Sequence, residues 1–186
     1  MMRKVSFLLG VGSIFLLTGC RHVTTTEDTP PISNEATTAM NVTLNEAIAS
    51  YETFYPDTTI TSIQLDATFG RYYYEITGVD DRKEYEVDID AESGEAKKDK
   101  EETLDRDEQH GIEAQEHGID FNNLKTFDEV TELARTAFGE GKVVKWQLEK
   151  DHGVTYWEIE LKEGKHEMSV TLDGKTGEIL EQEMDD

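Results

Sequence analysis

Apolar and polar residues alternate along three consecutive runs between residues 143 and 180. The apolar positions are Val144, Trp146 and Leu148, then Trp157, Ile159 and Leu161, then Met168, Val170 and Leu172. Side chains of a strand point alternately to its two faces, so each run has one apolar face and one polar face. The short glycine-containing segments between the runs predict hairpin loops and an antiparallel sheet.

A helix is predicted directly before this sheet, at residues 126–138. Apolar residues recur there at helical spacing, namely Phe127, Val130, Ala134 and Phe138. Thr126 and Glu129 have the spacing of a capping box, which favours a helix start. The apolar face of the sheet needs a cover, and we expect this helix to provide it.

The same pattern occurs earlier in the chain. Placing residue 43 on residue 126 aligns residues 43–96 with 126–179 without a gap. Identical residues then coincide at the helix start and in the turns, among them Thr43/Thr126, Glu46/Glu129, Gly70/Gly153, Asp90/Asp173 and Gly94/Gly177. Core positions match in kind: Ile63 with Trp146, Tyr74 with Trp157, Tyr85 with Met168 and Ile89 with Leu172. This internal duplication predicts an α+β fold of two tandem repeats, each one helix on a small antiparallel sheet of three to four strands.

Two short motifs recur in both copies. One is Y-x-E-I-x at residues 73–77 and 156–160, and the other is D-x-x-[ST]-G-E at residues 90–95 and 173–178. Together with the preceding helix, these motifs resemble the PepSY domain family, which is named for the propeptides of certain metallopeptidases and for a spore-cortex protein. The resemblance covers roughly two thirds of the chain and implies the fold more firmly than an activity.

The N-terminus has the pattern of a bacterial lipoprotein signal. Arg3 and Lys4 precede an apolar run that ends at Leu17, and Leu-Thr-Gly leads to Cys20, the sole cysteine of the chain. As a helix this run would span about 20 Å, short of the roughly 30 Å core of a bilayer. We expect residues 1–19 to be removed and Cys20 to receive lipid, which anchors the protein to the membrane. The alternative is a secreted protein with an incidental cysteine.

The rest of the chain divides by composition. Residues 20–42 are rich in Thr, Ser, Pro and Glu and predict a flexible stalk. The first repeat is expected at residues 43–98 and the second at 123–186, with an acidic linker at 99–122 between them. Ile119, Phe121 and Leu124 are expected to pack on the second repeat.

The chain is strongly acidic, with 41 acidic against 18 basic residues, a formal charge of −23 and a pI near 4.4. Such a surface disfavours nucleic acid as a partner. It would suit cationic partners or divalent ions, although solubility is the simpler explanation.

Motifs for metal binding or catalysis are incomplete. Residues 105–116 resemble a calcium loop, but His110 stands where the sharp-turn glycine belongs. His110 and His117 lack the cysteines or rigid scaffold of a zinc site. The sequence contains no HExxH, GxSxG or glycine-rich phosphate loop. We therefore predict no metal, no cofactor and no enzymatic activity.

Polar residues that alternate with the core positions are of the same type in both copies. They form the set of candidate partner-binding residues Gln64, Tyr73, Glu75, Glu84, Gln147, Tyr156, Glu158 and Glu167. Cross-strand pairing in a solvated sheet would account for them. The functional interpretation is a docking face, or an exposed sheet edge, for a polypeptide partner.

These features predict a lipid-anchored module on the outer side of a bacterial cytoplasmic membrane that binds an envelope protein. The PepSY resemblance implies a peptidase or cell-wall hydrolase as that partner, modulated by inhibition, folding assistance or retention. The alternative is a structural or divalent-cation-binding acidic envelope lipoprotein without a peptidase partner.

Overall fold

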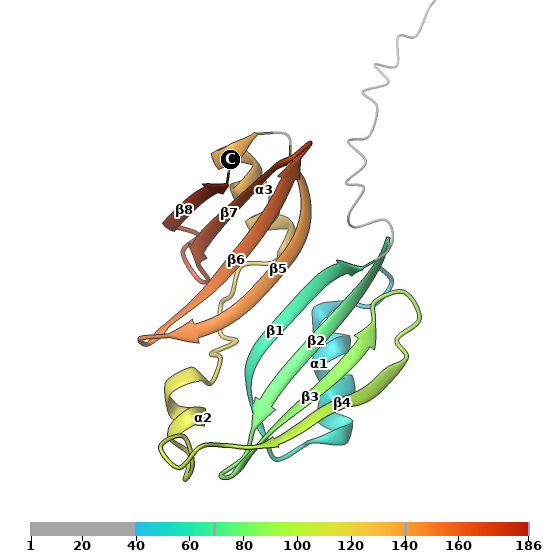
Figure 1. Cartoon of the computed structure of the whole chain (residues 1–186), viewed down its shortest axis with the longest axis vertical. Helices are drawn as coiled ribbons and strands as arrows, with labels where there is room; N and C mark the ends of the chain where they lie inside the picture. The colour runs from blue at the N-terminus through green and yellow to red at the C-terminus, as the bar shows by residue number, and fades with distance from the viewer. Residues whose placement is uncertain (1–39, 69, 140, 186) are drawn as a thin grey trace, which may run out of the picture. The chain divides into compact units, whose positions relative to one another are not determined.

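The fold is taken from a computed structural model, which describes residues 40–68, 70–139 and 141–185 (Figure 1). The predicted signal peptide, Cys20 and most of the predicted stalk lie outside the described residues. All described residues belong to one compact unit. Within these ranges no helix is both long enough and apolar enough to cross a bilayer.

Each repeat consists of one long helix and four strands. The first comprises α1 (Leu44–Phe54), β1 (Thr59–Thr68), β2 (Arg71–Val79), β3 (Lys83–Asp90) and β4 (Ala96–Thr103). The second comprises α3 (Phe127–Phe138), β5 (Lys142–Asp151), β6 (Val154–Glu163), β7 (His166–Asp173) and β8 (Ile179–Asp185), and a short helix, α2 (Ile112–His117), lies between the repeats. The predicted α+β fold with two helix-on-sheet repeats is confirmed.

Both long helices begin with the predicted capping box. The Thr43 backbone N–H donates to the Glu46 carboxylate at 2.8 Å, and the Glu46 N–H donates to Thr43 Oγ1 at 3.4 Å. Thr126 and Glu129 repeat this arrangement at 2.9 and 3.3 Å. Because the caps satisfy backbone donors that a helix leaves unpaired, they fix where each helix starts.

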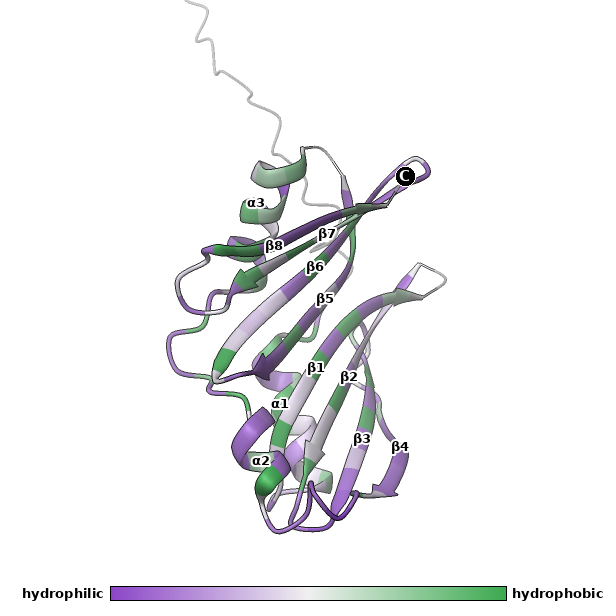
Figure 2. Cartoon of the chain, turned by 60° about the vertical axis from the view of Figure 1, so that its left-hand side comes forward, coloured by the Kyte–Doolittle hydropathy of each residue, from purple (hydrophilic) through white to green (hydrophobic). Residues whose placement is uncertain are grey.

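The core joins the two repeats. Phe127 of α3 lies 5.0 Å from the Trp157 ring of its own repeat and 6.3 Å from the Tyr74 ring of the first repeat. Tyr74 and Trp157 are fully buried, as predicted from the alternating pattern that Figure 2 shows along the strands. Buried Trp157 keeps a partner for its ring N–H, which donates to the Lys125 carbonyl at 3.1 Å.

The eight strands form a single antiparallel sheet in the order β4-β3-β2-β1-β5-β6-β7-β8. The two repeats meet where β1 pairs with β5, with Gln64 opposite Gln147 and Leu65 opposite Trp146. Gln64 and Gln147 are equivalent residues in the repeat alignment, so the pairing is symmetric about them. The repeat pattern of the sequence predicts two separate sheets, and that prediction is wrong, since the β1–β5 pair joins them into one sheet.

A β-bulge occurs at the same place in both copies, between Ile60 and Ser62 in β1 and between Val143 and Lys145 in β5. A bulge adds one residue to a strand and so shifts which side chains face the core. As a result Val143 is buried and Val144 is half-buried, so the prediction that Val144 belongs to the core pattern was wrong.

The segment between the repeats is more ordered than its composition suggests. Strand β4 continues to Thr103, and α2 lies beside β1 and β5. The Ile119 N–H donates to the Ile60 carbonyl of the first repeat at 2.9 Å, and Phe121 is 40% exposed. Ile119 is buried in the core that both repeats share, and Leu124 packs against this core close to Gly174. The expectation that Phe121 packs on the second repeat was wrong, since Phe121 is exposed.

Candidate functional site

The junction between the repeats brings together four of the eight candidate residues. Glu75 lies opposite Gln64, Gln64 opposite Gln147, and Gln147 opposite Glu158, so the four residues form one row across β2, β1, β5 and β6. Neighbouring strands in a sheet lie about 4.8 Å apart, so adjacent members of the row are in reach of each other. We call these four residues the central row. They are half-buried on the sheet face that points away from α1 and α3.

The two candidate tyrosines stand on either side of the central row. Tyr73 of β2 lies opposite Asp66, in the cross-strand row that continues through Lys145 to Glu160. Tyr156 of β6 is four residues along the strand from Glu160. Tyr73 and Tyr156 are three strands apart across the sheet and four residues apart along the strand direction, which places them about 20 Å from each other. They therefore occupy opposite corners of one polar surface, which we call the outward face.

Tyr156 is held by a polar cluster around Glu149. The Tyr156 hydroxyl donates to Glu149 Oε2 at 2.9 Å, and Ser62 Oγ of the first repeat donates to Glu149 Oε1 at 3.3 Å. The Gln147 side-chain amide also donates to Glu149 Oε1. Burial is the main cause that raises the pKa of Tyr156, and the hydrogen bond to Glu149 is the next. The Tyr156 hydroxyl is therefore a donor at neutral pH.

Tyr73 has a different setting in the first repeat. It lies opposite Asp66 on one side and Asp90 on the other, and Arg71 is nearby. The hydrogen bond with Tyr73 is the main cause that raises the pKa of Arg71. The two tyrosines are thus equivalent in position but contact different charges, so the outward face is only approximately symmetric.

Glu84 and Glu167 do not join the central row. Glu84 lies opposite Val79 and Glu102 near one end of β3. Glu167 lies opposite Lys162, and the Lys162 ammonium is 2.7 Å from its carboxylate. These two candidates therefore belong to the margins of the outward face.

Two acidic neighbours of the central row were missed by the sequence analysis. Carboxylate oxygens of Glu75, Glu86 and Asp88 lie within 4.8 Å of one another on β2 and β3. Burial is the main cause that raises the pKa of Glu86 to about 7, and the charge of Glu75 and a hydrogen bond with Asp99 raise it as well. Glu86 and Asp88 alternate with core residues in β3, but the second copy has Ser and Thr there, so comparing the copies could not identify them.

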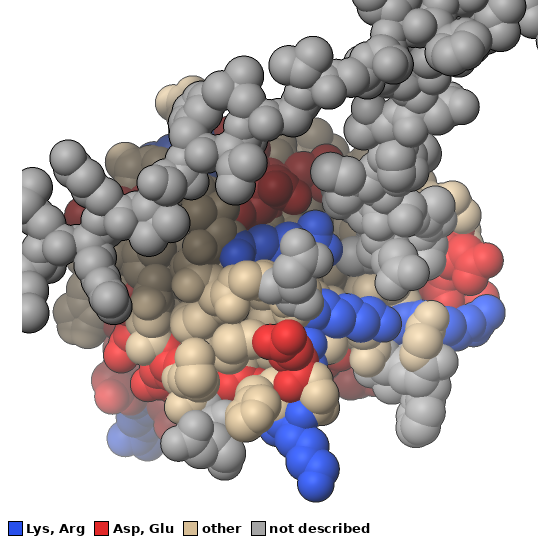
Figure 3. Space-filling view, turned by 90° about the horizontal axis from the view of Figure 1, so that it is seen from above, with Lys and Arg blue, Asp and Glu red and all other residues tan. Residues whose placement is uncertain are grey.

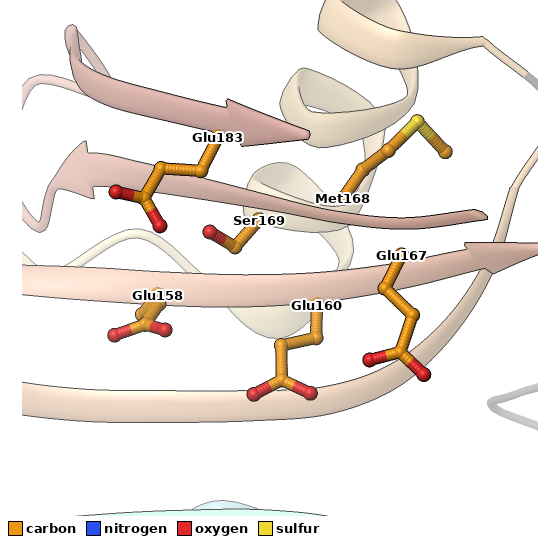
Figure 4. Close-up of a pocket in the computed structure, with 6 residues that line it drawn as sticks. All are labelled: Glu158, Glu160, Glu167, Met168, Ser169 and Glu183. Atoms are coloured by element: carbon orange, nitrogen blue, oxygen red, sulfur yellow. The ribbon is translucent and has the colours of Figure 1, made fainter. Parts of the chain in front are cut away.

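The second repeat has an acidic hollow on the same face, with a volume of about 210 Å³. Its lining residues are Glu158, Glu160, Glu167, Met168, Ser169 and Glu183. Figure 4 shows the four glutamates on one side of β6, β7 and β8, whereas Met168 points away from them. The small Ser169 lies between Glu160 and Glu183 in a cross-strand row, which leaves the space open. Such a hollow favours cationic side chains.

Negative charge is not uniform over the rest of the surface. Figure 3 shows lysine and arginine side chains interspersed with acidic ones at one end of the molecule. On the outward face itself, Lys145 forms an ion pair with Glu160 at 3.4 Å and lies near the central row. The face therefore combines carboxylates, amides, tyrosines and one central lysine.

The D-x-x-[ST]-G-E motifs are turns. In the first copy Asp90 accepts hydrogen bonds from the backbone N–H groups of Glu92 and Ser93, and Gly94 has φ +75°. In the second copy Asp173 accepts from Lys175 and Thr176 in the same way. The motif thus closes a β-turn in each repeat, and only its first residue, Asp90 or Asp173, reaches the outward face, opposite Tyr73 or Tyr156.

Comparisons with known proteins agree with this architecture. Residues 41–100 and 125–183 each match the family described as peptidase propeptide and YPEB domain, or PepSY. A crystal structure of a candidate lipoprotein from Clostridium difficile 630 is similar with a TM-score of 0.73 and 31% sequence identity, over 78% of this chain and 95% of that chain. A comparison with curated proteins finds no match. The two matched segments cover the two repeats seen in the sheet except for the last residues of β4 and β8. The chain therefore belongs to the PepSY family and carries two copies of its domain.

Proposed function

We propose that this tandem PepSY protein is a binding module that modulates an envelope peptidase or cell-wall hydrolase. It is anchored by lipid on Cys20 to the outer side of the bacterial cytoplasmic membrane. The family description, which refers to peptidase propeptides, supports both a peptidase-like partner and action by binding rather than catalysis. The Leu-Thr-Gly-Cys sequence and the similarity to a candidate lipoprotein support the anchor.

The observation that carries this proposal is the continuous outward face. Because β1 pairs with β5, the central row runs unbroken from one repeat into the other. A single repeat would expose only half of this row and one tyrosine. Tyrosine offers a large, stiff and amphipathic surface that is favoured in protein interfaces. The duplication thus builds a two-tyrosine docking surface that one PepSY copy lacks.

Divalent-cation binding is a second candidate function, favoured by the cluster of three carboxylates formed by Glu75, Glu86 and Asp88. Two features compete with a cation there. Lys97 Nζ is 2.8 Å from the Asp88 carboxylate, and the raised pKa of Glu86 means that a proton occupies part of the site at neutral pH. Calorimetric titration with calcium chloride separates the two functions. Saturable binding that a Glu86→Gln change abolishes would support the cation function.

The experiment that tests the proposal is site-specific photocrosslinking in intact cells. A photoreactive phenylalanine analogue replaces Tyr73 or Tyr156, one at a time. The matched control places it at Glu52, an exposed residue of α1 on the opposite side of the sheet. We expect both tyrosine positions, and not the control, to capture the same peptidase or cell-wall hydrolase.

The captured enzyme is then assayed with and without the purified chain. A change in its rate, yield of folded enzyme or retention at the membrane identifies the mode of modulation. Capture of equal products from all three positions, or capture of no such enzyme, would contradict the proposal.

A further inference from the structure

The sheet ends in two strands that differ sharply in character. In the described sheet, β4 and β8 each have a neighbouring strand on one side only. An edge strand leaves backbone N–H and C=O groups unpaired, and natural proteins often protect such an edge with lysine. Strand β4 carries Lys97, Lys98 and Lys100, whereas the residues of β8 at the equivalent sheet register are Glu181, Gln182 and Glu183. Only β4 has this protection.

The side of β8 that continues the helix-covered face carries Ile179, Gln182 and Met184, so it is largely apolar, and all three side chains are exposed. Ile179 lies opposite Leu172 and Met184 opposite Met168, and both of those partners are core residues. Ile179 is nevertheless 43% exposed and Met184 61% exposed, and Leu180 at the adjoining bulge is 51% exposed. At the equivalent sheet register, β4 has Ala96 in place of Ile179 and Glu101 in place of Met184.

The helices explain why this margin is open. At the end of α1, the Tyr55 ring lies 4.4 Å from Lys98 Nζ of β4, so the first repeat is covered up to its edge. Helix α3 packs mainly on β6 and β7. Figure 1 shows β8 at the margin of the second repeat, beyond those two strands.

The opposite side of β8 is acidic. Glu181 lies opposite Thr171 and Glu183 opposite Ser169, both on the outward face. Glu183 also lines the acidic hollow together with Glu158 and Glu160. The β8 edge therefore has an apolar side, an acidic side and unpaired backbone groups between them.

We propose that β8 is a docking edge that adds one extended strand from a partner protein, in which apolar residues alternate with lysine or arginine. The apolar side chains of that strand would cover Ile179 and Met184, and its basic side chains would face Glu181 and Glu183. Its backbone would continue the hydrogen-bonded ladder of the sheet. Ile179 and Met184 lie on the opposite face of the sheet from the central row, so changes at these two residues can remove the β8 docking edge while the central row remains.

A second copy of this chain fits the β8 edge less well. An antiparallel pair of β8 strands would place glutamates against glutamates, which is unfavourable. Strand β4 of another copy offers lysines, but Lys98 lies opposite the core residue Val87 and Glu101 lies opposite the half-buried Tyr85. The helix-facing side of β4 therefore has no large apolar side chain to cover Ile179 and Met184. The charge and apolar patterns together favour a different protein.

The test uses the chain from residue 21 onward, which retains every described element. The probe is a fluorescent octapeptide of alternating valine and lysine, titrated by fluorescence anisotropy. One control peptide alternates valine and glutamate, and another is the valine–lysine peptide with N-methylated amides that cannot join a ladder. We expect the first peptide to bind saturably and both controls to bind at least about tenfold more weakly.

Protein variants assign the binding to β8. The double change Ile179→Lys and Met184→Lys gives β8 the protection of β4, and its matched control is Ala96→Lys with Glu101→Lys. We expect the β8 change to weaken binding about tenfold or more and the β4 change to leave it unaltered. Melting temperatures show that each variant is folded. Equal loss in both variants, equal binding of the N-methylated peptide, failure of the wild-type chain to bind, or association of the chain with itself through β8 would overturn the proposal.

Discussion

Replacing Trp157 with alanine tests whether the two repeats share one core. Trp157 is fully buried in β6, and its ring lies 5.0 Å from Phe127 of α3. Phe127 also contacts Tyr74 of the first repeat, at 6.3 Å between ring centroids. A cavity at Trp157 would weaken the packing around Phe127. Because Phe127 also contacts the first repeat, we expect the substitution to destabilise both repeats.

The magnitude follows from the size of the removed side chain. Truncating a large buried aromatic residue to alanine costs about 3–5 kcal/mol, since transfer and cavity terms add. Domains typically have about 5–15 kcal/mol of stability in total. One kcal/mol shifts the melting temperature by about 2–4 °C in a domain near this size, so a decrease of roughly 6–20 °C is expected. Trp157→Phe is the milder control, since it keeps a ring and loses chiefly the hydrogen bond to the Lys125 carbonyl.

Thermal unfolding should be followed by two probes in the Trp157→Ala variant. Circular dichroism reports both repeats, and fluorescence reports Trp146, the one tryptophan that remains of the two in the chain. Trp146 lies in β5 opposite Leu65 of the first repeat, so it senses the junction. A shared core predicts one transition at the same temperature with both probes. An unchanged melting temperature would refute the assigned register of β6, and two separate transitions would refute the shared core.

Three further predictions concern other parts of the chain. Cys20→Ser should abolish incorporation of a labelled fatty acid, and label that persists in this variant would exclude Cys20 as the anchor. Because the pKa of Glu86 is raised to about 7 from 4.5, its contribution to stability is complete below about pH 4.5 and is lost as the pH rises through 7. Glu86→Gln should therefore raise the melting temperature by about 3 °C at pH 8 and by much less at pH 4.5, and an equal shift at both would contradict this. Gly78→Ala would place a Cβ 2.3 Å from the Tyr51 hydroxyl, so it should lower the free energy of unfolding by about 1–3 kcal/mol. Urea unfolding measures this, and an unaltered midpoint would contradict the close approach.

Much of each repeat could be predicted from the sequence because local patterns encode it. The capping boxes at Thr43 and Thr126 and the alternating core residues act through contacts within one helix or between hairpin strands. The glycine turns at Gly94 and Gly177 are equally local, since a positive φ selects glycine there. These elements appear where the patterns placed them.

Two features of the strands could not be predicted in this way. Strand β4 is mostly charged, since its edge position exposes it to water, and so its residues 99–103 were predicted to belong to the linker. The bulges at residues 60–62 and 143–145 move Val143 into the core in place of Val144 without leaving a glycine or proline as a signal. Alternation alone assigns a strand's faces only while its register is unbroken.

The sequence predicts individual residues of the candidate site but not their arrangement. Identity between the two copies marks Gln64 and Gln147 as outward residues. The pairing of β1 with β5, however, depends on backbone hydrogen bonds, which depend little on which side chains are present. The central row exists only because of that pairing. Glu86 and Asp88 have Ser169 and Thr171 as counterparts in the second copy, so identity between the copies does not mark them as site residues.

The central claim is that the outward face binds an envelope enzyme through both tyrosines, and the most direct test is the affinity of the captured enzyme for the Tyr73→Ala, Tyr156→Ala double variant. Truncation of a tyrosine anchor often costs at least 2 kcal/mol, which is about thirtyfold in affinity. We therefore expect binding at least about thirtyfold weaker than wild type, with circular dichroism unchanged. Wild-type affinity in a folded double variant would contradict the claim and leave the outward face as a solvated scaffold.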